Sequence, residues 1–305
     1  MMWMGILLGL AAATLQSFCY IVSGSYVRRT GRAGWTLTAP QRALMLIPYG
    51  ALTLATWPDS FDGEGLPFLA GAATCMVMAY LGDVGLFQMQ KTVEPSRVAP
   101  LQALKIPLIA LLSWALLGRI YSGGQILGIL LVVASAAILC DAGARIGRTA
   151  WLWMLVCSGG FAVSDIGVGC ALAHSREICG GLLRSSLFTL GVTGLGSSVL
   201  ALPVVASQKV SGTLPTVREC LRYALPFGAL WMVAMIFLFV CFSLSGIVPG
   251  TIAQSTRGLI SVAVGWFLAR HGFADLERGV TADAFRRRAI AALLIIVAMV
   301  LYCLS

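Results

Sequence analysis

The sequence has little charge and contains no asparagine. Only 11% of its 305 residues are Asp, Glu, Lys or Arg, whereas 59% are hydrophobic and the mean hydropathy is +0.90. A soluble globular surface needs more charge than this. The composition therefore argues against a soluble enzyme or a nucleic-acid binder and indicates an integral membrane protein. The missing asparagine excludes an N-glycosylation sequon.

The sequence also lacks the motifs that catalysis, metal binding or ATP hydrolysis need. Its nine cysteines include no Cys-x-x-Cys pair, and its two histidines offer no metal-ligand spacing. It has no phosphate-binding loop, no pair of catalytic acids and no nucleophile elbow. We therefore expect no enzyme activity, no cofactor, no metal and no ATP-driven pump. The formal charge of +9 is explained by basic loops that orient the chain, so no nucleic-acid partner is expected.

What the sequence does contain is a series of apolar stretches of about twenty residues, each near the length that spans a bilayer. Ten windows can be drawn: 3–26, 37–57, 66–90, 96–118, 123–140, 150–173, 181–206, 221–244, 248–270 and 287–304. The connections between them are short. The predicted fold is an all-α, polytopic membrane protein with ten transmembrane helices in a single transmembrane domain, residues 1–305.

The cations are distributed unevenly between the two sides of this predicted bundle. Loops after the odd-numbered windows, with their flanking positions, hold sixteen of the 21 lysines and arginines, Arg42 among them, and the opposite side holds three. The positive-inside rule places the odd-numbered loops in the cytoplasm and both termini outside. We expect a multi-pass protein of the cell inner (plasma) membrane.

Ten helices divide into two sets of five, residues 1–149 and 150–305, and a repeat with an odd number of helices enters the membrane in the opposite direction the second time. A shift of 152 residues places an amide, a cation and an indole of the first half on the same residue types in the second. The three pairs are Gln102 and Gln254, Lys105 and Arg257, and Trp114 and Trp266. Inverted repeats of this kind are typical of secondary transporters, whose substrate site lies near the midplane between the repeats.

The two cations Lys105 and Arg257 lie near the middle of their apolar windows, where a charged side chain is costly and normally faces a cavity, a ligand or an opposite charge. We predict that they bind an anionic group of the substrate, with Gln102 and Gln254 adding hydrogen bonds from the same helix faces. On the ninth window this face continues through Ser261.

The alternative for these cations is internal neutralisation by Asp83 or Asp165, the two carboxylates well inside a window. Either aspartate could instead titrate and couple transport to protons, or accept a substrate amine. Asp83 has Tyr80 one turn before it. In the first window, Gln16 and Tyr20 form part of a polar face that could line the cavity or pack between helices.

Residues 96–139, SRVAPLQALKIPLIALLSWALLGRIYSGGQILGILLVVASAAIL, resemble the fourth and fifth helices of the drug/metabolite transporter superfamily, especially its EamA-type ten-helix branch. The likeness lies in a polar entry, a mid-helix proline, an LG turn, a Gln-x-x-Gly motif and a last helix rich in small residues. The family often has an acidic residue after the LG, where this chain has Arg119.

The resemblance implies alternating access around a central cavity and transport of a small polar metabolite. In the nucleotide-sugar and triose-phosphate branches, cations on the fourth and ninth helices hold substrate phosphate, and Lys105 and Arg257 stand on those helices here. Family members are commonly drawn with both termini in the cytoplasm, which conflicts with the charge distribution, and we keep the orientation that the charges indicate.

The functional prediction is a secondary transporter for a small polar metabolite that bears a carboxylate or phosphate. One alternative is an exporter of amino acids or cationic compounds that uses the intramembrane aspartates. Another is a non-transporting scaffold or an enzyme acting on lipid head groups. The expected partners are the small-molecule substrate and the lipid bilayer, with the proton as a candidate coupling ion, and the chain is expected to be a monomer or a homodimer.

Overall fold

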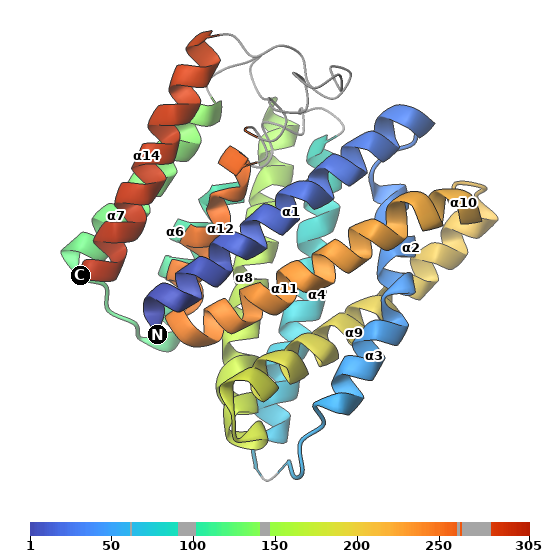
Figure 1. The fold of residues 1–305 in the computed structure, drawn as a ribbon, viewed down its shortest axis with the longest axis horizontal. Helices are drawn as coiled ribbons and strands as arrows, with labels where there is room; N and C mark the ends of the chain where they lie inside the picture. The colour runs from blue at the N-terminus through green and yellow to red at the C-terminus, as the bar shows by residue number, and fades with distance from the viewer. Residues whose placement is uncertain (62, 91–101, 141–146, 261–262, 264–281) are drawn as a thin grey trace.

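A computed structural model describes the chain except for residues 62, 91–101, 141–146, 261–262 and 264–281 (Figure 1). The described part is helical apart from its connections. Its elements are α1 (Met2–Thr30), α2 (Trp35–Leu44), α3 (Leu46–Ala55), α4 (Gly65–Gln90), η1 (Gln102–Leu104), α6 (Lys105–Leu117), α7 (Gly123–Cys140), α8 (Arg148–Cys179), α9 (Leu182–Val210), α10 (Val217–Glu219), η2 (Cys220–Ala224), α11 (Leu225–Ser245), α12 (Ile247–Ser255) and α14 (Ala282–Leu304).

Among the residues that the structure describes, five helical stretches are long and apolar enough to cross a membrane: Met2–Val27, Gly65–Leu86, Arg148–Cys179, Leu182–Val210 and Val217–Ser245. Shorter apolar helices cover Leu46–Ala55, Gln102–Leu116, Gly123–Ile138 and Leu293–Leu304. All of these overlap the windows drawn from the sequence. The structure therefore agrees with an all-helical, multi-pass membrane protein.

The second predicted window, 37–57, is not one helix. It is divided into α2 and α3 at Met45, three residues before Pro48. A proline lacks the backbone N–H and its ring displaces the carbonyl of the residue four positions earlier, here Leu44, so the helix cannot continue smoothly through this point. A second local change is the π-helical turn η2, which precedes Pro226 for the same reason.

Glycine lets helices from the two halves of the chain touch along their backbones. The most extensive contact is between α4 and α8. A Cβ added at Gly85 would lie 2.6 Å from the backbone nitrogen of Cys157, and one at Gly160 would lie 2.7 Å from that of Gly82. Small residues at membrane helix interfaces allow this close approach.

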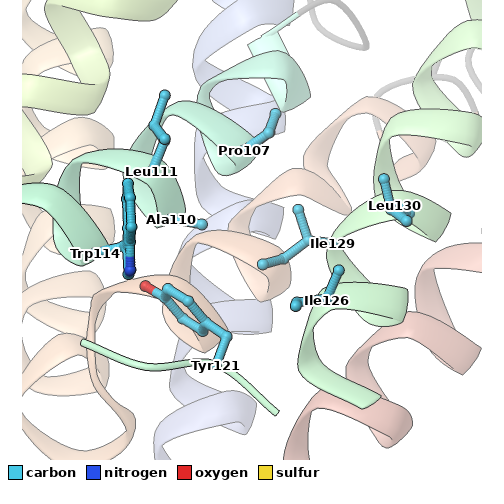
Figure 2. Close-up of a pocket in the computed structure, with 8 residues that line it drawn as sticks. All are labelled: Pro107, Ala110, Leu111, Trp114, Tyr121, Ile126, Ile129 and Leu130. Carbon is cyan, nitrogen blue, oxygen red and sulfur yellow. The ribbon is translucent and has the colours of Figure 1, made fainter. Parts of the chain in front are cut away.

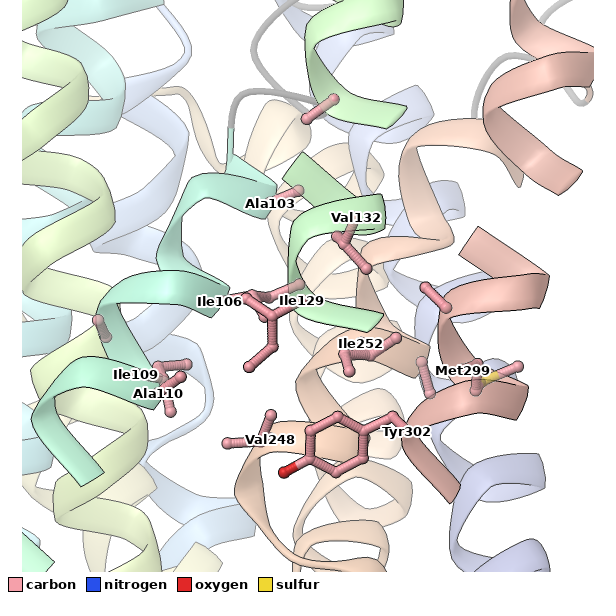
Figure 3. Packing of buried hydrophobic residues seen from close by; sticks show 14 of the residues in the cluster. Ala103, Ile106, Ile109, Ala110, Ile129, Val132, Val248, Ile252, Met299 and Tyr302 are labelled. Carbon is pink, nitrogen blue, oxygen red and sulfur yellow. The ribbon is translucent and has the colours of Figure 1, made fainter. Parts of the chain in front are cut away.

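The next most extensive contacts between the halves are those of α1 with α11, α7 with α14, and α3 with α9. In Figure 1, α7 and α14 lie side by side, and both chain termini lie on the left of the view. Figure 3 shows the largest apolar cluster, in which Ile106 of α6, Ile129 of α7, Ile252 of α12 and Met299 of α14 pack together. This apolar cluster borders the polar residues described next.

Candidate functional site

Both predicted cations lie where a helix is interrupted. Lys105 is the first residue of α6 and follows the 3-10 turn η1, and Arg257 directly follows the turn at Thr256 that ends α12. Both are buried, with 6% of each residue exposed. A helix that is interrupted within the membrane places polar backbone and side chains around a central site, as in many transporters.

The structure brings these cations together through crossed contacts with the amides. Lys105 Nζ donates a 2.7 Å hydrogen bond to Oε1 of Gln254, which precedes the other cation. Arg257 in turn donates to Oε1 of Gln102, which precedes Lys105. Each cation is therefore bound by the amide of the other half of the chain.

Gln16 of α1 joins the two crossed pairs. Its Oε1 accepts hydrogen bonds from Arg257 (3.2 Å) and from Nε2 of Gln254 (3.1 Å). Its own Nε2 is buried and has no hydrogen-bond partner among the described residues. The neighbouring Ser17 donates to the backbone oxygen of Arg257 at 3.0 Å. Helix α1 therefore contacts both the side chain of Arg257, through Gln16, and its backbone, through Ser17.

Asp165 of α8 neutralises Lys105 directly. Its Oδ2 lies 2.7 Å from Nζ, and the two side chains are 14% and 7% exposed. The internal ion pair that was the alternative for Lys105 is thus present in the structure. Removing one partner of such a buried pair leaves a charge without compensation, so a ligand that binds Lys105 must replace this carboxylate or share the cation with it.

Asp83 does not join this central cluster, which consists of Gln16, Gln102, Lys105, Asp165, Gln254 and Arg257. Instead it forms a half-buried ion pair with Arg42 of α2. Arg42 lies five residues inside its own apolar window, 37–57, where a cation needs a partner as much as it does in the other windows, and Asp83 provides that partner. Its Nη1 has no hydrogen-bond partner among the described residues.

Three further predicted residues have different outcomes. Tyr80 is half-buried on α4, one turn before Asp83, as its spacing predicts. Tyr20 lies on α1, in the turn after Gln16, but its side chain is outside the described part of the structure. Ser261 also lies outside the described residues.

A cavity of about 240 Å³ lies between α6 and α7 but is separate from the central cluster. Figure 2 shows that its lining is apolar and aromatic: Pro107, Ala110, Leu111, Trp114, Tyr121, Ile126, Ile129 and Leu130. Trp114 and Leu111 are more than half exposed, so this cavity opens toward the outside of the bundle. It contains no charged group and does not suit a polar substrate.

The helical architecture and the buried ionic cluster can be compared with known proteins. Residues 3–140 match the model of the EamA-like transporter family. The EamA-like segment runs from α1 to α7 and contains Gln16, Asp83, Gln102 and Lys105. The resemblance read from residues 96–139 is therefore confirmed, and the match is to a family of membrane transporters, not of enzymes.

The fold relationship extends beyond the EamA-like segment. A solved crystal structure superposes with a TM-score of 0.67 at 18% sequence identity, covering 98% of this chain and 96% of that chain. In all, 21 solved chains match. At this identity the likeness concerns the fold alone. No curated protein sequence matches the chain.

Proposed function

We propose that this protein is a secondary transporter that moves a small polar metabolite by alternating access, and that its ten helices form two inverted repeats, 1–149 and 150–305. The helix pairs support this arrangement. In the proposed repeats, α4 is the third helix of the first repeat and contacts α8, the first helix of the second repeat. Correspondingly, α1 is the first helix of the first repeat and contacts α11, the third helix of the second repeat. A twofold relation between the repeats would exchange these two contacts.

The proposed substrate bears a carboxylate or a phosphate, which binds between Lys105 and Arg257. The observation that carries this proposal is the crossed pairing, because it places one cation from each repeat in a single buried cluster. At present Arg257 donates to the amide oxygens of Gln102 and Gln16, whereas Lys105 donates to that of Gln254 as well as to the carboxylate of Asp165. An ionised oxygen is a stronger acceptor for a charged donor than an amide, and the guanidinium can hold two of its oxygens at once.

An incoming anion also meets a free donor. Gln16 Nε2 is buried without a hydrogen-bond partner among the described residues, and such groups cost free energy until they are satisfied. Because Gln16 contacts both Arg257 and Gln254, a small movement of its amide would direct this donor at an oxygen held by the cations. The cluster would then contribute two cations and one amide donor to the substrate.

The same contacts explain how binding could be coupled to movement of the repeats. The bonds from Lys105 to Gln254 and from Arg257 to Gln102 cross from one half of the chain to the other. Rocking the halves apart on one side would stretch them. A substrate anion that bridges the cations would replace these bonds, so the loaded protein could change its conformation without leaving buried charges unsatisfied.

The alternative of a cationic substrate held by the aspartates has less support. Asp165 is already neutralised by Lys105 and Asp83 by Arg42. A cationic ligand would have to displace the side chain of Lys105 or Arg42 from its aspartate, which would leave that side chain without an opposite charge. We therefore keep the anionic substrate as the proposed class.

Uptake into proteoliposomes tests the proposal. A metabolite panel is first screened for compounds that raise the melting temperature of the purified protein, because a ligand that binds the folded state stabilises it. Transport of the stabilising compounds is then measured in Lys105→Gln and Arg257→Gln. Lys209→Gln and Arg218→Gln serve as matched controls, because both residues are exposed and lie far along the chain from the cluster. Wild-type anion transport in both central variants would reject the proposal.

We also propose that the protein resides in the inner (plasma) membrane with both termini outside, as the distribution of basic loops indicates. A reporter that is active only in the cytoplasm, fused after Ser305, tests the orientation. An active reporter would contradict the proposed location of the C-terminus.

A further inference from the structure

A second cavity, also of about 240 Å³, has a lining that differs entirely from that of the cavity beside Trp114. It is formed where the segment after α6, the last turns of α8, the start of α9 and the joint between α11 and α12 meet. Its lining residues are Arg119, Gly169, Leu172, Ala173, Arg176, Ser185, Phe242, Ser243, Gly246 and Ile247. Unlike the cavity beside Trp114, it therefore contains two guanidinium groups and two hydroxyl groups.

The two arginines of this cavity are exposed and available to a ligand. Two acidic side chains of the loop before α4 have partners of their own: Asp59 pairs with Arg184 at 3.2 Å, and Glu64 pairs with His174. Glu177 is exposed and directly follows Arg176. The hydrogen bond and charge of Arg184 hold the pKa of Asp59 below its ordinary value, so this carboxylate stays ionised in its own pair. Among the described residues, neither Arg119 nor Arg176 belongs to an ion pair.

The cavity lies on the same helix faces as the central cluster. On α8, Gly169 and Arg176 follow Asp165 by four and eleven residues, which places all three on one face over about 16 Å of helix. On α12, Ile247 lies seven residues, or two turns, before Gln254. The lining of the cavity therefore leads along both helices toward the ion pair of Lys105 and Asp165.

One apolar contact joins α8 and α12 within the lining of the cavity. A Cβ added at Gly169 would lie only 2.1 Å from Cδ1 of Ile247, so the tip of this isoleucine rests directly on the α8 backbone. The residue before it, Gly246, has a φ of +87° and joins α11 to α12. Because only glycine adopts this backbone conformation readily, the joint allows a sharp change of direction immediately beside the contact.

We propose that the cavity is an anion-binding vestibule, in which Arg119 and Arg176 hold the carboxylate or phosphate of the substrate before it passes Ile247 and reaches Lys105. The inference rests on the anionic substrate proposed above and adds a second binding site to it. Two cations in one concave site raise the local concentration of anions and select against cations. The chemistry recognised is an oxyanion, which a soluble metabolite and an anionic lipid head group both offer.

Charge-selective labelling of the cavity tests the vestibule without any transport measurement. Ser243→Cys introduces a thiol in the lining. Its modification by the anionic reagent sulfonatoethyl methanethiosulfonate is compared with that by the cationic trimethylammonioethyl reagent. The purified protein is held in nanodiscs of phosphatidylcholine, and labelling is read at position 243 by peptide mass spectrometry because the chain has nine native cysteines.

Two nearby positive charges should favour the anionic reagent, and Arg119→Gln with Arg176→Gln should lower the anionic-to-cationic rate ratio about three- to ten-fold at low salt. The charge-conserving pair Arg119→Lys with Arg176→Lys should keep the ratio. Equal ratios in the wild-type and glutamine backgrounds would overturn the proposal. If the double variant does not fold, Arg176→Gln alone gives the same comparison with a smaller expected change, and an unchanged ratio there is equally decisive.

Competition identifies the source of the oxyanion. Citrate or inorganic phosphate should slow modification by the anionic reagent in the wild-type background but not in the glutamine variant. Protection by phosphatidylglycerol in the nanodisc, without protection by the soluble anions, would assign the site to a lipid head group and would overturn its role as a substrate vestibule. Because labelling does not require transport, a vestibule that fails this test leaves the central site to be judged by Lys105→Gln and Arg257→Gln alone.

Discussion

Lys105 and Gln254 lie 149 positions apart in the chain, and a hydrogen bond of 2.7 Å joins their side chains. The reciprocal contact, from Arg257 to Gln102, joins the same two segments in the opposite sense. A repeat that simply placed each amide beside its own cation would not link the halves. The crossed contacts do, and they make the polar cluster part of the interface between the two halves of the chain.

Removing one charge of the Lys105–Asp165 ion pair should destabilise the protein, whereas replacing both charges with apolar side chains should not. We expect Asp165→Asn to lower the free energy of unfolding by about 3–5 kcal/mol, because it leaves the buried lysine uncompensated. The double variant Lys105→Met with Asp165→Leu should recover most of that loss while remaining inactive in transport. Thermal unfolding in detergent measures both effects, and a double variant no more stable than Asp165→Asn would contradict this account.

Proton movement should depend on whether the substrate carries an amine. A simple anion that binds Lys105 leaves the carboxylate of Asp165 without its partner in a largely buried site, which costs free energy. A proton on that carboxylate removes the cost. Uptake of such an anion should therefore rise as the pH falls and should be accompanied by protons. A zwitterion of the same skeleton supplies its own ammonium to Asp165 and should move without them. Uptake followed with a pH-sensitive dye in the vesicle lumen compares the two.

The decisive control for this coupling is Asp165→Asn, in which an anion should move without proton flux. Equal proton flux with both kinds of substrate would argue against a role for Asp165, as would a pH dependence that survives the substitution.

The backbone contact between α4 and α8 should tolerate no added methyl group. Gly160→Ala would place a Cβ 2.7 Å from the nitrogen of Gly82 and should destabilise the protein by about 1–3 kcal/mol. The adjacent Gly159 has nothing within 4 Å of its Cβ position. Gly159→Ala should therefore be neutral or stabilising by up to about 1 kcal/mol, through its better helix propensity. Melting temperatures of the two variants provide the comparison, and similar losses in both would show that the close approach does not matter.

The apolar contact of Ile247 with Gly169 should limit access from the vestibule to the centre. Thr251→Cys places a thiol one turn further along α12, where the side chain is fully buried. Its modification by a neutral methanethiosulfonate should be slow and should accelerate when Ile247→Ala is added. Val248→Ala removes apolar bulk in the same turn without touching the cavity and should have little effect. Equal acceleration by both substitutions would indicate general loosening and not a gate.

Several features of this protein followed from its sequence because they depend on local composition. Apolar stretches near the thickness of a bilayer predicted the helices, and residues 96–139 showed the resemblance to the EamA-like transporter family. The depth of Lys105 and Arg257 in their apolar windows singled them out, since a charged group there requires compensation wherever the neighbouring helices lie. The same reasoning applied to Arg42 would have predicted an acidic partner for it.

Only the tertiary structure decided which groups provide that compensation. Spacing along the chain put Gln102 beside Lys105 and Gln254 beside Arg257, but the contacts are exchanged between the halves, and of the two aspartates only Asp165 belongs to the cluster. Partners separated by 60 to 155 positions depend on how whole helices pack, through close glycine contacts such as that of Gly160 with Gly82. Hydropathy and local spacing specify which side chains must find a partner in the membrane, whereas the helix packing determines which partner each one meets.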